Sequence, residues 1–439
     1  MDTPRLFNFR YTLNMSGVQL GYTEKMDGSH DRVRVSRADR RHHTLVTGKT
    51  GTGKSTLLEN MIVQDIRNGE GVAVIDPHGS LIENLLQRIP KERIKDVVYV
   101  NPADTKYPIG FNLLAAKDKE QHHLIVSSVV SIFKHLYKDS WGPRLEMVLA
   151  NAISAVLAAS HPTLLGVYRI LVDDKYRKQV VKRLSDPVLK SFWDEFESYD
   201  MRFKKEVVSP VLNKIGQLLM TPLLRNIVGQ ATSTINIKDI METKKILLVR
   251  VSKGELGEEK SNLLGSAMLT KIFLTVLERE GTPASQRPDF YLYVDEFHNY
   301  LTDVFAAILS EARKYRLNLI LAHQYLGQVS EEVRHALFGN IGTMIVFRIG
   351  ATDADVFEKE FAPHSSFTAE LLRKQKNYEF SYKTLLRGVE QEPSFARSYP
   401  PLEFLGDEVK ATSLIRASRQ RYGKKKEIIE SKLSRFLGK

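Results

Sequence analysis

A chain of 439 residues with 42% hydrophobic and 26% charged residues has the size and composition of a globular protein of two or three domains. It contains no cysteine, which excludes disulfides, zinc–thiolate sites and cysteine nucleophiles, and it has no apolar run of about 18 residues and no signal-peptide pattern. The net charge is +12, and we expect a cytoplasmic protein with no membrane span, peripheral at the inner face of the membrane only through a partner.

Three short runs near the N-terminus predict parallel β-strands. They span residues 44–46 (TLV), 71–76 (GVAVID) and 96–100 (DVVYV), and each is apolar on both faces. Such runs are typical of strands in the middle of a parallel sheet, where both faces are buried.

The first strand leads into GKTGTGKS, which matches the Walker A pattern G-x-x-x-x-G-K-[ST] and precedes an apolar helix. The glycines let backbone N–H groups turn toward phosphate oxygens, and the helix presents its positive end to them. Lys54 is predicted to reach the β- and γ-phosphates, Ser55 to bind Mg²⁺, and Thr56 to contact the α-phosphate. The predicted nucleotide-binding residues are Gly48, Lys49, Thr50, Gly51, Thr52, Gly53, Lys54, Ser55 and Thr56.

From residue 117 to about residue 230 the apolar spacing is that of helices. Apolar residues recur at i, i+3, i+4, i+7 and i+11 from Leu145 and line one face. Pro143 and Pro187 suit the first turns of two of these helices. The predicted helices span residues 145–156, 167–172, 188–196 and 208–219.

Strand-like runs return after the helical block, over residues 246–251 (ILLVRV), 290–294 (FYLYV), 317–322 (LNLILA) and 343–349 (TMIVFRI). Lys54 and Asp295 are expected to meet at one nucleotide although 241 residues separate them. The sequence therefore predicts an α/β domain with a parallel-rich sheet, interrupted by an inserted all-α domain.

The run YLYVDEF over residues 291–297 ends a buried strand in two adjacent carboxylates. Asp295 is predicted to hold the Mg²⁺ shell, and Glu296 to orient and deprotonate the attacking water. The alternative is an ordinary strand end with two solvent-facing acids. Beside a Walker A motif we favour the catalytic interpretation, and a glutamate at the second position points to hydrolysis.

Two more strand ends are candidates for the same site, because strand ends beside a phosphate-binding loop face the ligand crevice. Gln324 follows LNLILA and is predicted to sense the γ-phosphate, unless it merely ends a strand. Asp76 ends GVAVID and supports the magnesium or the water network, or is a solvated strand end. No guanine-specific N-K-x-D sequence is present, so ATP is the expected nucleotide.

Several stretches taken together resemble the HerA/FtsK superfamily of P-loop ATPases, and most closely the type IV secretion coupling-protein (TraG/TraD-like) family. They are RRHHTLVTGKTGTGKSTLL, GEGVAVIDPHGSL, VVYVNPADTKYPIGFNLL, VSKGELGEEKSNLLG, YLYVDEFHNY, SEARKYRLNLILAHQ and GNIGTMIVFRIGATDADVFEKEF. The resemblance implies a RecA-like motor domain with an all-α insertion. It also implies a homo-oligomeric ring, usually of six subunits, with ATP at the subunit borders and DNA in the channel.

The expected domain boundaries follow from these stretches. Spanning helices at the N-terminus, typical of membrane-anchored coupling proteins, are not expected here, and about 40 residues are too few for the β-barrel of HerA. A relaxase, a secretion channel or a nuclease are the partners that the family implies. The expected segments are an N-terminal segment (1–40), an ATPase domain in two parts (41–116 and 236–405), the all-α insertion (117–235) and a basic C-terminal tail (406–439).

Ring ATPases of this kind need a positive charge for the γ-phosphate, often from the neighbouring subunit. Arg313 in SEARKYR is the first candidate, and Arg348 in VFRIG is the second. Lys314 and Arg316 are alternatives to Arg313, and each arginine is equally compatible with a structural or surface role.

The DNA contacts are predicted from basic residues. Lys253 and Lys260 bracket a glycine-containing loop that faces a pore or is an exposed, acid-rich turn. Arg202, Lys204 and Lys205 form a basic cluster in the helical block, or a solvated helix face.

The basic tail offers two interpretations. Residues 428–437 predict a short amphipathic helix with Ile429, Leu433 and Leu437 on one face. We expect that face to dock on a partner or on the next subunit. The alternative is a tail whose cations grip DNA, namely Arg419, Arg421, Lys424, Lys425 and Lys426.

The leading hypothesis is an ATP-driven motor that translocates DNA in the manner of coupling proteins. A secretion-system or pilus-assembly ATPase is the second hypothesis. A DNA-repair or defence helicase-translocase that works with a nuclease, as HerA does, is the third.

Overall fold

The computed structural model describes residues 17–116, 118–361, 367–402 and 407–438. The first sixteen residues of the expected N-terminal segment and Lys117, where the helical block was expected to begin, lie outside these ranges.

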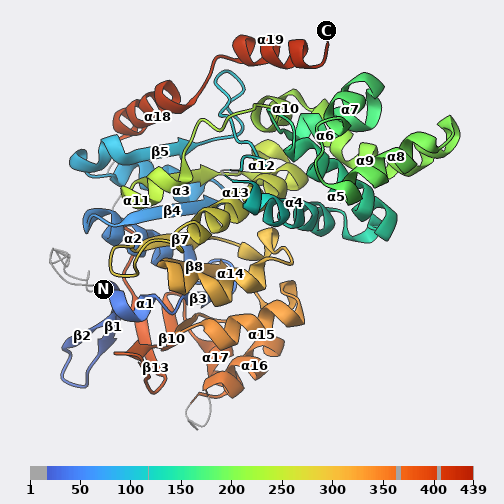
Figure 1. Cartoon of the computed structure of the whole chain (residues 1–439). Helices are drawn as coiled ribbons and strands as arrows, with labels where there is room; N and C mark the ends of the chain where they lie inside the picture. Colours follow the sequence, from blue (N-terminus) through green and yellow to red (C-terminus); the bar gives the residue numbers. More distant parts are fainter. Residues whose placement is uncertain (1–16, 117, 362–366, 403–406, 439) are drawn as a thin grey trace.

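Eleven strands of the described residues form one mixed sheet at the centre of the molecule (Figure 1). From edge to edge its strands are β2 (His30–Ser36), β1 (Gly17–Glu24), β13 (Ser394–Ser398), β10 (Glu379–Lys383), β9 (Thr343–Val346), β3 (Thr44–Thr47), β8 (Leu317–His323), β7 (Phe290–Val294), β4 (Gly71–Asp76), β6 (Ile246–Arg250) and β5 (Val97–Val100). A separate two-stranded ribbon is formed by β11 (Leu385–Leu386) and β12 (Val389–Glu390).

The seven strands from β9 to β5 all run parallel, and they are the seven strands predicted from the sequence. Their residues are almost entirely buried because helices cover both faces. Alternate residues of each strand divide between two hydrophobic cores: Leu45 joins one and Val46 the other. The predicted α/β fold with a parallel-rich sheet is therefore confirmed.

Four antiparallel strands extend this sheet, and the sequence analysis did not predict them. β10 pairs with β9, β13 with β10, β1 with β13, and β2 with β1. Tyr22 thus lies opposite Arg397, although they stand at opposite ends of the chain. A register shift between Gln19 and Gly21 interrupts the alternation of β1, which weakens its sequence signal.

The helices form two layers. On one face lie α2 (Lys54–Arg67) and α3 (Ser80–Arg88), which pack on β4. The other core contains the buried side of α13 (Glu258–Leu277) together with the helices of the insertion. The remaining helices of the ATPase part are α1 (Arg37–Arg40), α12 (Lys253–Leu256), α14 (Phe305–Glu311), α15 (Glu331–Asn340), α16 (Ala351–Phe361) and α17 (Ala369–Lys374).

Between β5 and β6 the described residues form helices and no strand (Figure 1). Each of the four predicted helices is present, and Pro143 and Pro187 occupy first turns. α4 packs on α13, so this block shares a core with the sheet. Its helices are α4 (His122–Leu136), α5 (Pro143–Leu157), α6 (Leu164–Val172), α7 (Asp174–Val181), α8 (Pro187–Ser198), α9 (Met201–Met220), α10 (Pro222–Val228) and α11 (Ile237–Glu242).

Within the described ranges, no single helix has both the length and the apolar character needed to cross a membrane. α9 and α10 taken together are long and apolar enough for a membrane span, but the chain bends by 99° between them.

The C-terminal tail forms two helices, α18 (Glu408–Tyr422) and α19 (Lys426–Phe436). α18 packs on α3 and β5, and α19 packs on α10, so the tail runs from the sheet edge to the helical block (Figure 1). Ile429 and Leu433 are buried there. The amphipathic helix was predicted correctly, but its expected docking on another chain was wrong: the apolar face is covered by this chain's own insertion.

Candidate active site

The phosphate-binding loop joins β3 to α2. Gly51 and Gly53 have φ angles of 76° and 119°, which residues other than glycine rarely adopt. A Cβ atom on Gly53 would lie 3.0 Å from the Tyr378 ring and 3.2 Å from the Phe347 ring, so these two rings pack closely against the loop and leave little space for a side chain at Gly53. These glycines fold the backbone into the cradle that the motif predicts.

Four adjacent strands end at this loop, because β3, β8, β7 and β4 are neighbours and run parallel. Gln324 follows β8, Asp295 and Glu296 follow β7, and Asp76 ends β4. Residues far apart in sequence therefore converge at one edge of the sheet. This edge is where open α/β sheets bind their ligands.

The acids at this edge are buried and close together. Asp295 is 5% exposed, and its pKa is raised to about 7 by burial first and then by the charges of Glu296 and Asp76. Burial lowers the pKa of Lys54, and the charges of Glu296 and Asp295 oppose that shift. Such a carboxylate favours a cation beside it, which suits a divalent metal ligand.

Lys54 points back into the loop rather than to an acid. Its Nζ donates to the carbonyl oxygens of Gly48 at 2.5 Å and Lys49 at 3.3 Å. Ser55 is exposed at the start of α2, where a hydroxyl is accessible to a ligand. Lys54, which is predicted to bind phosphate, and Ser55, which is predicted to bind the metal, thus both lie at the N-terminus of α2.

Glu296 has an unusual backbone for a residue with a side chain. Its φ is 46°, in the left-handed region, and the side chain is buried. Gln324 Nε2 donates to its Oε1 at 3.0 Å. Strained backbone of this kind is typical of functional sites. The contact unites the residue predicted to act as base with the residue predicted to sense the γ-phosphate.

Asp76 is neither a solvated strand end nor free to move. It is fully buried, and its two oxygens accept from the backbone N–H groups of His78 at 2.8 Å and Ile82 at 3.2 Å. Its charge acts on Asp295 through space.

A hollow of about 490 Å³ opens beside the loop. It lies between the Lys49–Thr50 tip and the Gln324–Tyr325 strand end, with Gly350 and the start of α16 on the far side. This is room for a phosphate group and water next to Glu296's hydrogen-bond partner.

Arg348 and Arg313 lie at opposite ends of the parallel strands: Arg348 follows the C-terminal end of β9, and Arg313 precedes the N-terminal end of β8. Arg348 follows β9 beside the loop, and its carbonyl oxygen accepts from Lys49 N–H at 2.9 Å. Its guanidinium donates to Asn377 Oδ1 at 3.0 Å. Arg313 is exposed and precedes β8, so it is one strand length, about 20 Å, from the loop of its own chain.

Sequence analysis missed Tyr378, because only the fold brings it to the loop. Its N–H donates to the Thr52 carbonyl at 2.8 Å, and its ring lies against Gly53. Its φ is 67° and its side chain is partly exposed. Tyr378 therefore provides an aromatic wall next to the phosphate cradle.

The residues predicted to contact DNA are scattered. Lys253 Nζ donates to Asn299 Oδ1 at 2.7 Å and pairs with Glu258 at 2.9 Å, close beneath the acidic edge, while Lys260 is half-buried in α13. In α9, Arg202 and Lys205 are exposed, whereas Lys204 pairs with Glu197 at 3.1 Å. The structure brings none of the α9 residues to the nucleotide edge.

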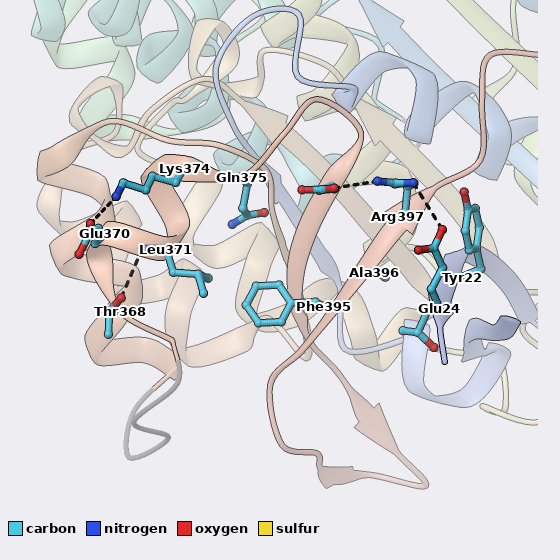
Figure 2. A pocket seen from close by; sticks show the side chains of 12 residues that line it. Tyr22, Glu24, Thr368, Glu370, Leu371, Lys374, Gln375, Phe395, Ala396 and Arg397 are labelled. Atoms are coloured by element: carbon cyan, nitrogen blue, oxygen red, sulfur yellow. Dashed lines mark hydrogen bonds and ion pairs between the residues drawn. The ribbon is translucent and has the colours of Figure 1, made fainter. Parts of the chain in front are cut away.

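A larger hollow, of about 670 Å³, lies on the antiparallel extension (Figure 2). It is lined by Tyr22 and Arg397 on the paired strands β1 and β13, by Phe395, and by Leu371 and Lys374 of α17. Arg397 pairs with Glu379 at 2.9 Å inside it. No residue of the phosphate-binding loop and no strand-end acid lines it, whereas Lys49, Thr50 and Gln324 line the smaller hollow.

A glycine-rich loop between a strand and a helix, with an acidic pair at the end of another parallel strand of the same sheet, defines a P-loop NTPase; here one strand, β8, lies between the two. The family model described as the type IV secretion-system coupling protein DNA-binding domain matches residues 29–393. The chain therefore belongs to this coupling-protein family, as the motifs predicted. It has no significant sequence match among curated proteins.

Solved structures share the fold. The plasmid coupling protein TrwB in complex with ADP and Mg²⁺ superposes with a TM-score of 0.64 at 15% identity, covering 86% of this chain and 90% of TrwB. TrwB with a non-hydrolysable ATP analogue gives 0.65 at 14% identity, covering 85% and 88%. VirB4 of Thermoanaerobacter pseudethanolicus gives 0.57 at 15% identity, covering 88% and 97%.

Proposed function

We propose that this P-loop NTPase hydrolyses ATP with Mg²⁺ and works as a hexameric ring motor that translocates DNA. The observation that carries the proposal is the convergence of the phosphate loop, the Asp295–Glu296 pair and Gln324 on one sheet edge, with Gln324 bonded to Glu296 at 3.0 Å. A base held in place beside a phosphate cradle suits hydrolysis by an oriented water.

The residues fit the implied nucleotide and metal. Asp295, with its pKa raised to about 7 by burial and neighbouring acids, and the accessible Ser55 hydroxyl would hold Mg²⁺. The TrwB structures with ADP and Mg²⁺ and with an ATP analogue support the same pair of cofactors. The metal neutralises phosphate charge when bound. Lys54 would exchange its backbone carbonyl partners for phosphate oxygens, and Glu296 would accept the proton of the water.

We infer the division of labour from the order of the elements. Residues 41–116 and 236–405 form the motor, and its sheet is extended by β1 and β2 from the N-terminal segment (1–40). Residues 117–235 form the all-α insertion and residues 406–439 the tail. Arg313, exposed and far from its own loop, is suited to act on the nucleotide of an adjacent subunit, while Arg348 lies next to its own loop.

DNA as the substrate is supported by the description of the family as a DNA-binding domain and by the net charge of +12. A relaxase or a secretion channel fits that role as a partner, and a nuclease fits a repair or defence motor. The second candidate is a secretion-system ATPase that moves no DNA, because the family description also names the type IV secretion system.

The two candidates separate in one experiment. ATP and GTP hydrolysis are measured with no DNA, with single-stranded DNA and with duplex DNA, each at low and moderate salt, and Glu296→Gln serves as the inactive control. A DNA motor is stimulated by DNA, and the stimulation falls as salt rises because phosphate contacts release counterions. Hydrolysis that DNA does not change at low salt supports the secretion ATPase instead.

A further inference from the structure

The second carboxylate oxygen of Glu296 has a neighbour that neither the motifs nor the family description assigns. Oε1 accepts from Gln324, while Oε2 lies 3.4 Å from His298 Nδ1. Neither Oε2 nor Nδ1 has a hydrogen bond of normal geometry among the described residues, and both atoms are buried. Contacts of this length are common in free active sites and shorten when the reacting complex forms.

The opposite nitrogen of the His298 ring fixes where its proton sits. Gln328 Nε2 lies 3.0 Å from His298 Nε2. The Gln328 amide is oriented by its own oxygen, which accepts from Tyr325 N–H at 3.4 Å. Its NH₂ group therefore faces the imidazole and donates to it. A ring nitrogen that accepts a hydrogen bond carries no proton, so in a neutral ring the proton is on Nδ1.

The surroundings keep this ring neutral and hold the backbone beneath it. Burial is the largest influence on His298, and it lowers the pKa, with Lys253 acting in the same direction and Glu296 and Glu258 opposing it. Asn299 Nδ2 donates to the Glu296 carbonyl oxygen at 2.8 Å, and Asn299 in turn accepts from Lys253. Asn299 thus stabilises the left-handed backbone of Glu296, while Gln324 and His298 contact the two oxygens of its carboxylate.

We propose that His298 is a positioning residue: its Nδ1–H, set by Gln328, fixes the Glu296 carboxylate in the orientation that activates water. The inference rests on the proposed function, since it assigns Glu296 as the base. Besides the direct hydrogen bond from Gln324, it gives the loop that follows β8 a second, indirect connection to the Glu296 carboxylate, through Tyr325, Gln328 and His298.

Paired substitutions test which nitrogen matters. Asn places its amide N–H near the position of Nδ1, whereas Gln reaches the position of Nε2. His298→Asn is expected to keep a kcat close to wild type, and His298→Gln and His298→Ala to lower kcat by about ten- to a hundredfold. The KM for ATP stays unchanged, because Lys54 and Ser55 are untouched. His335→Ala, at a side chain that is 76% exposed, is the matched control and keeps wild-type activity.

The second measurement needs no hydrolysis. Protein labelled with ¹⁵N-histidine, in the free form at pH 7.5, is expected to show His298 as the Nδ1–H tautomer; its signals are assigned by their loss in His298→Asn. An Nε2–H tautomer, or a kcat retained by Gln and lost by Asn, overturns the proposal and leaves the proposed ATPase intact. An Nδ1–H tautomer in a wild-type protein that hydrolyses no nucleotide supports the hydrogen-bond chain and overturns the proposed function.

Discussion

The docking of the tail on its own chain can be tested at Leu433 of α19. Leu433 is 7% exposed and lies against Gly229, where an added Cβ would be 3.2 Å from Leu433 Cδ2. Leu433→Ala removes this contact. Because the site faces solvent on one side and can partly collapse, we expect a loss near the lower end of the range for buried leucines, about 2–3 kcal/mol. The helix is therefore undocked about 30- to about 160-fold more often.

Hydrogen exchange monitored by mass spectrometry measures this directly. The peptide covering residues 424–438 is expected to exchange faster in Leu433→Ala by the same factor, while the β3–α2 region is unchanged. Ile428→Ala is the matched control: the residue is 51% exposed on the same helix, and its replacement should shift local stability by less than about 0.5 kcal/mol.

The same docking predicts how the tail affects DNA binding. Arg419 pairs with Asp104 at 2.6 Å, and Arg421 donates to the Lys95 carbonyl oxygen at 2.7 Å. With these cations engaged on the chain itself, deleting residues 418–439 should leave the slope of log K against log[salt] nearly unchanged. Exchange that Leu433→Ala does not accelerate, or a slope that flattens by about 0.9 per lost phosphate contact after the deletion, would refute the reasoning.

Four further outcomes follow from the structure. Lys54→Ala should weaken ATP binding and abolish hydrolysis, measured by nucleotide titration and phosphate release, because the charge over the β- and γ-phosphates is lost. Rings mixed from Arg313→Ala and Glu296→Gln chains should regain some hydrolysis if Arg313 acts in trans; no recovery in rings of proven subunit exchange counts against it. Burial lowers the pKa of His43 to about 4 in the folded protein, below the unfolded value of 6.5. The contribution of the neutral ring to the free energy of unfolding is therefore complete above pH 6.5 and is lost as the pH falls toward 4, by up to about 3 kcal/mol. Chemical unfolding of His43→Gln should show a free energy of unfolding that depends less on pH between 6.5 and 4. Tyr378→Ala should raise the KM for ATP severalfold with little change in kcat if the ring supports the nucleotide, and Tyr378→Phe should not.

The parallel half of the sheet could be predicted from the sequence, because strands that are buried on both faces appear as short apolar runs. A continuous apolar run such as residues 72–75 (VAVI) indicates a buried parallel strand in a chain with a Walker A motif, and the helical block is visible from its 3.6-residue spacing. The position of the acidic pair Asp295–Glu296 was predictable for the same reason: it follows a buried strand in a chain that already carries a glycine-rich phosphate-binding motif.

The antiparallel half depends on contacts between distant segments. β1 carries a register shift, and it is a stable strand because β13, from the far end of the chain, pairs with it. No local pattern encodes that pairing. Tyr378 reaches the loop by the same long-range route, through a backbone hydrogen bond to Thr52.

What the sequence by itself determined was therefore the chemistry and the parallel core: the cradle, the acids, and the strands whose two buried faces leave a strong local signal. Tertiary structure alone decided which polar groups hold those acids and where the tail rests. The hydrogen bond from Gln324 to Glu296 and the contact of His298 with Glu296 depend on strand order and loop geometry. The apolar face that includes Ile429 predicts that α19 packs on another surface, but the sequence pattern does not specify which surface that is.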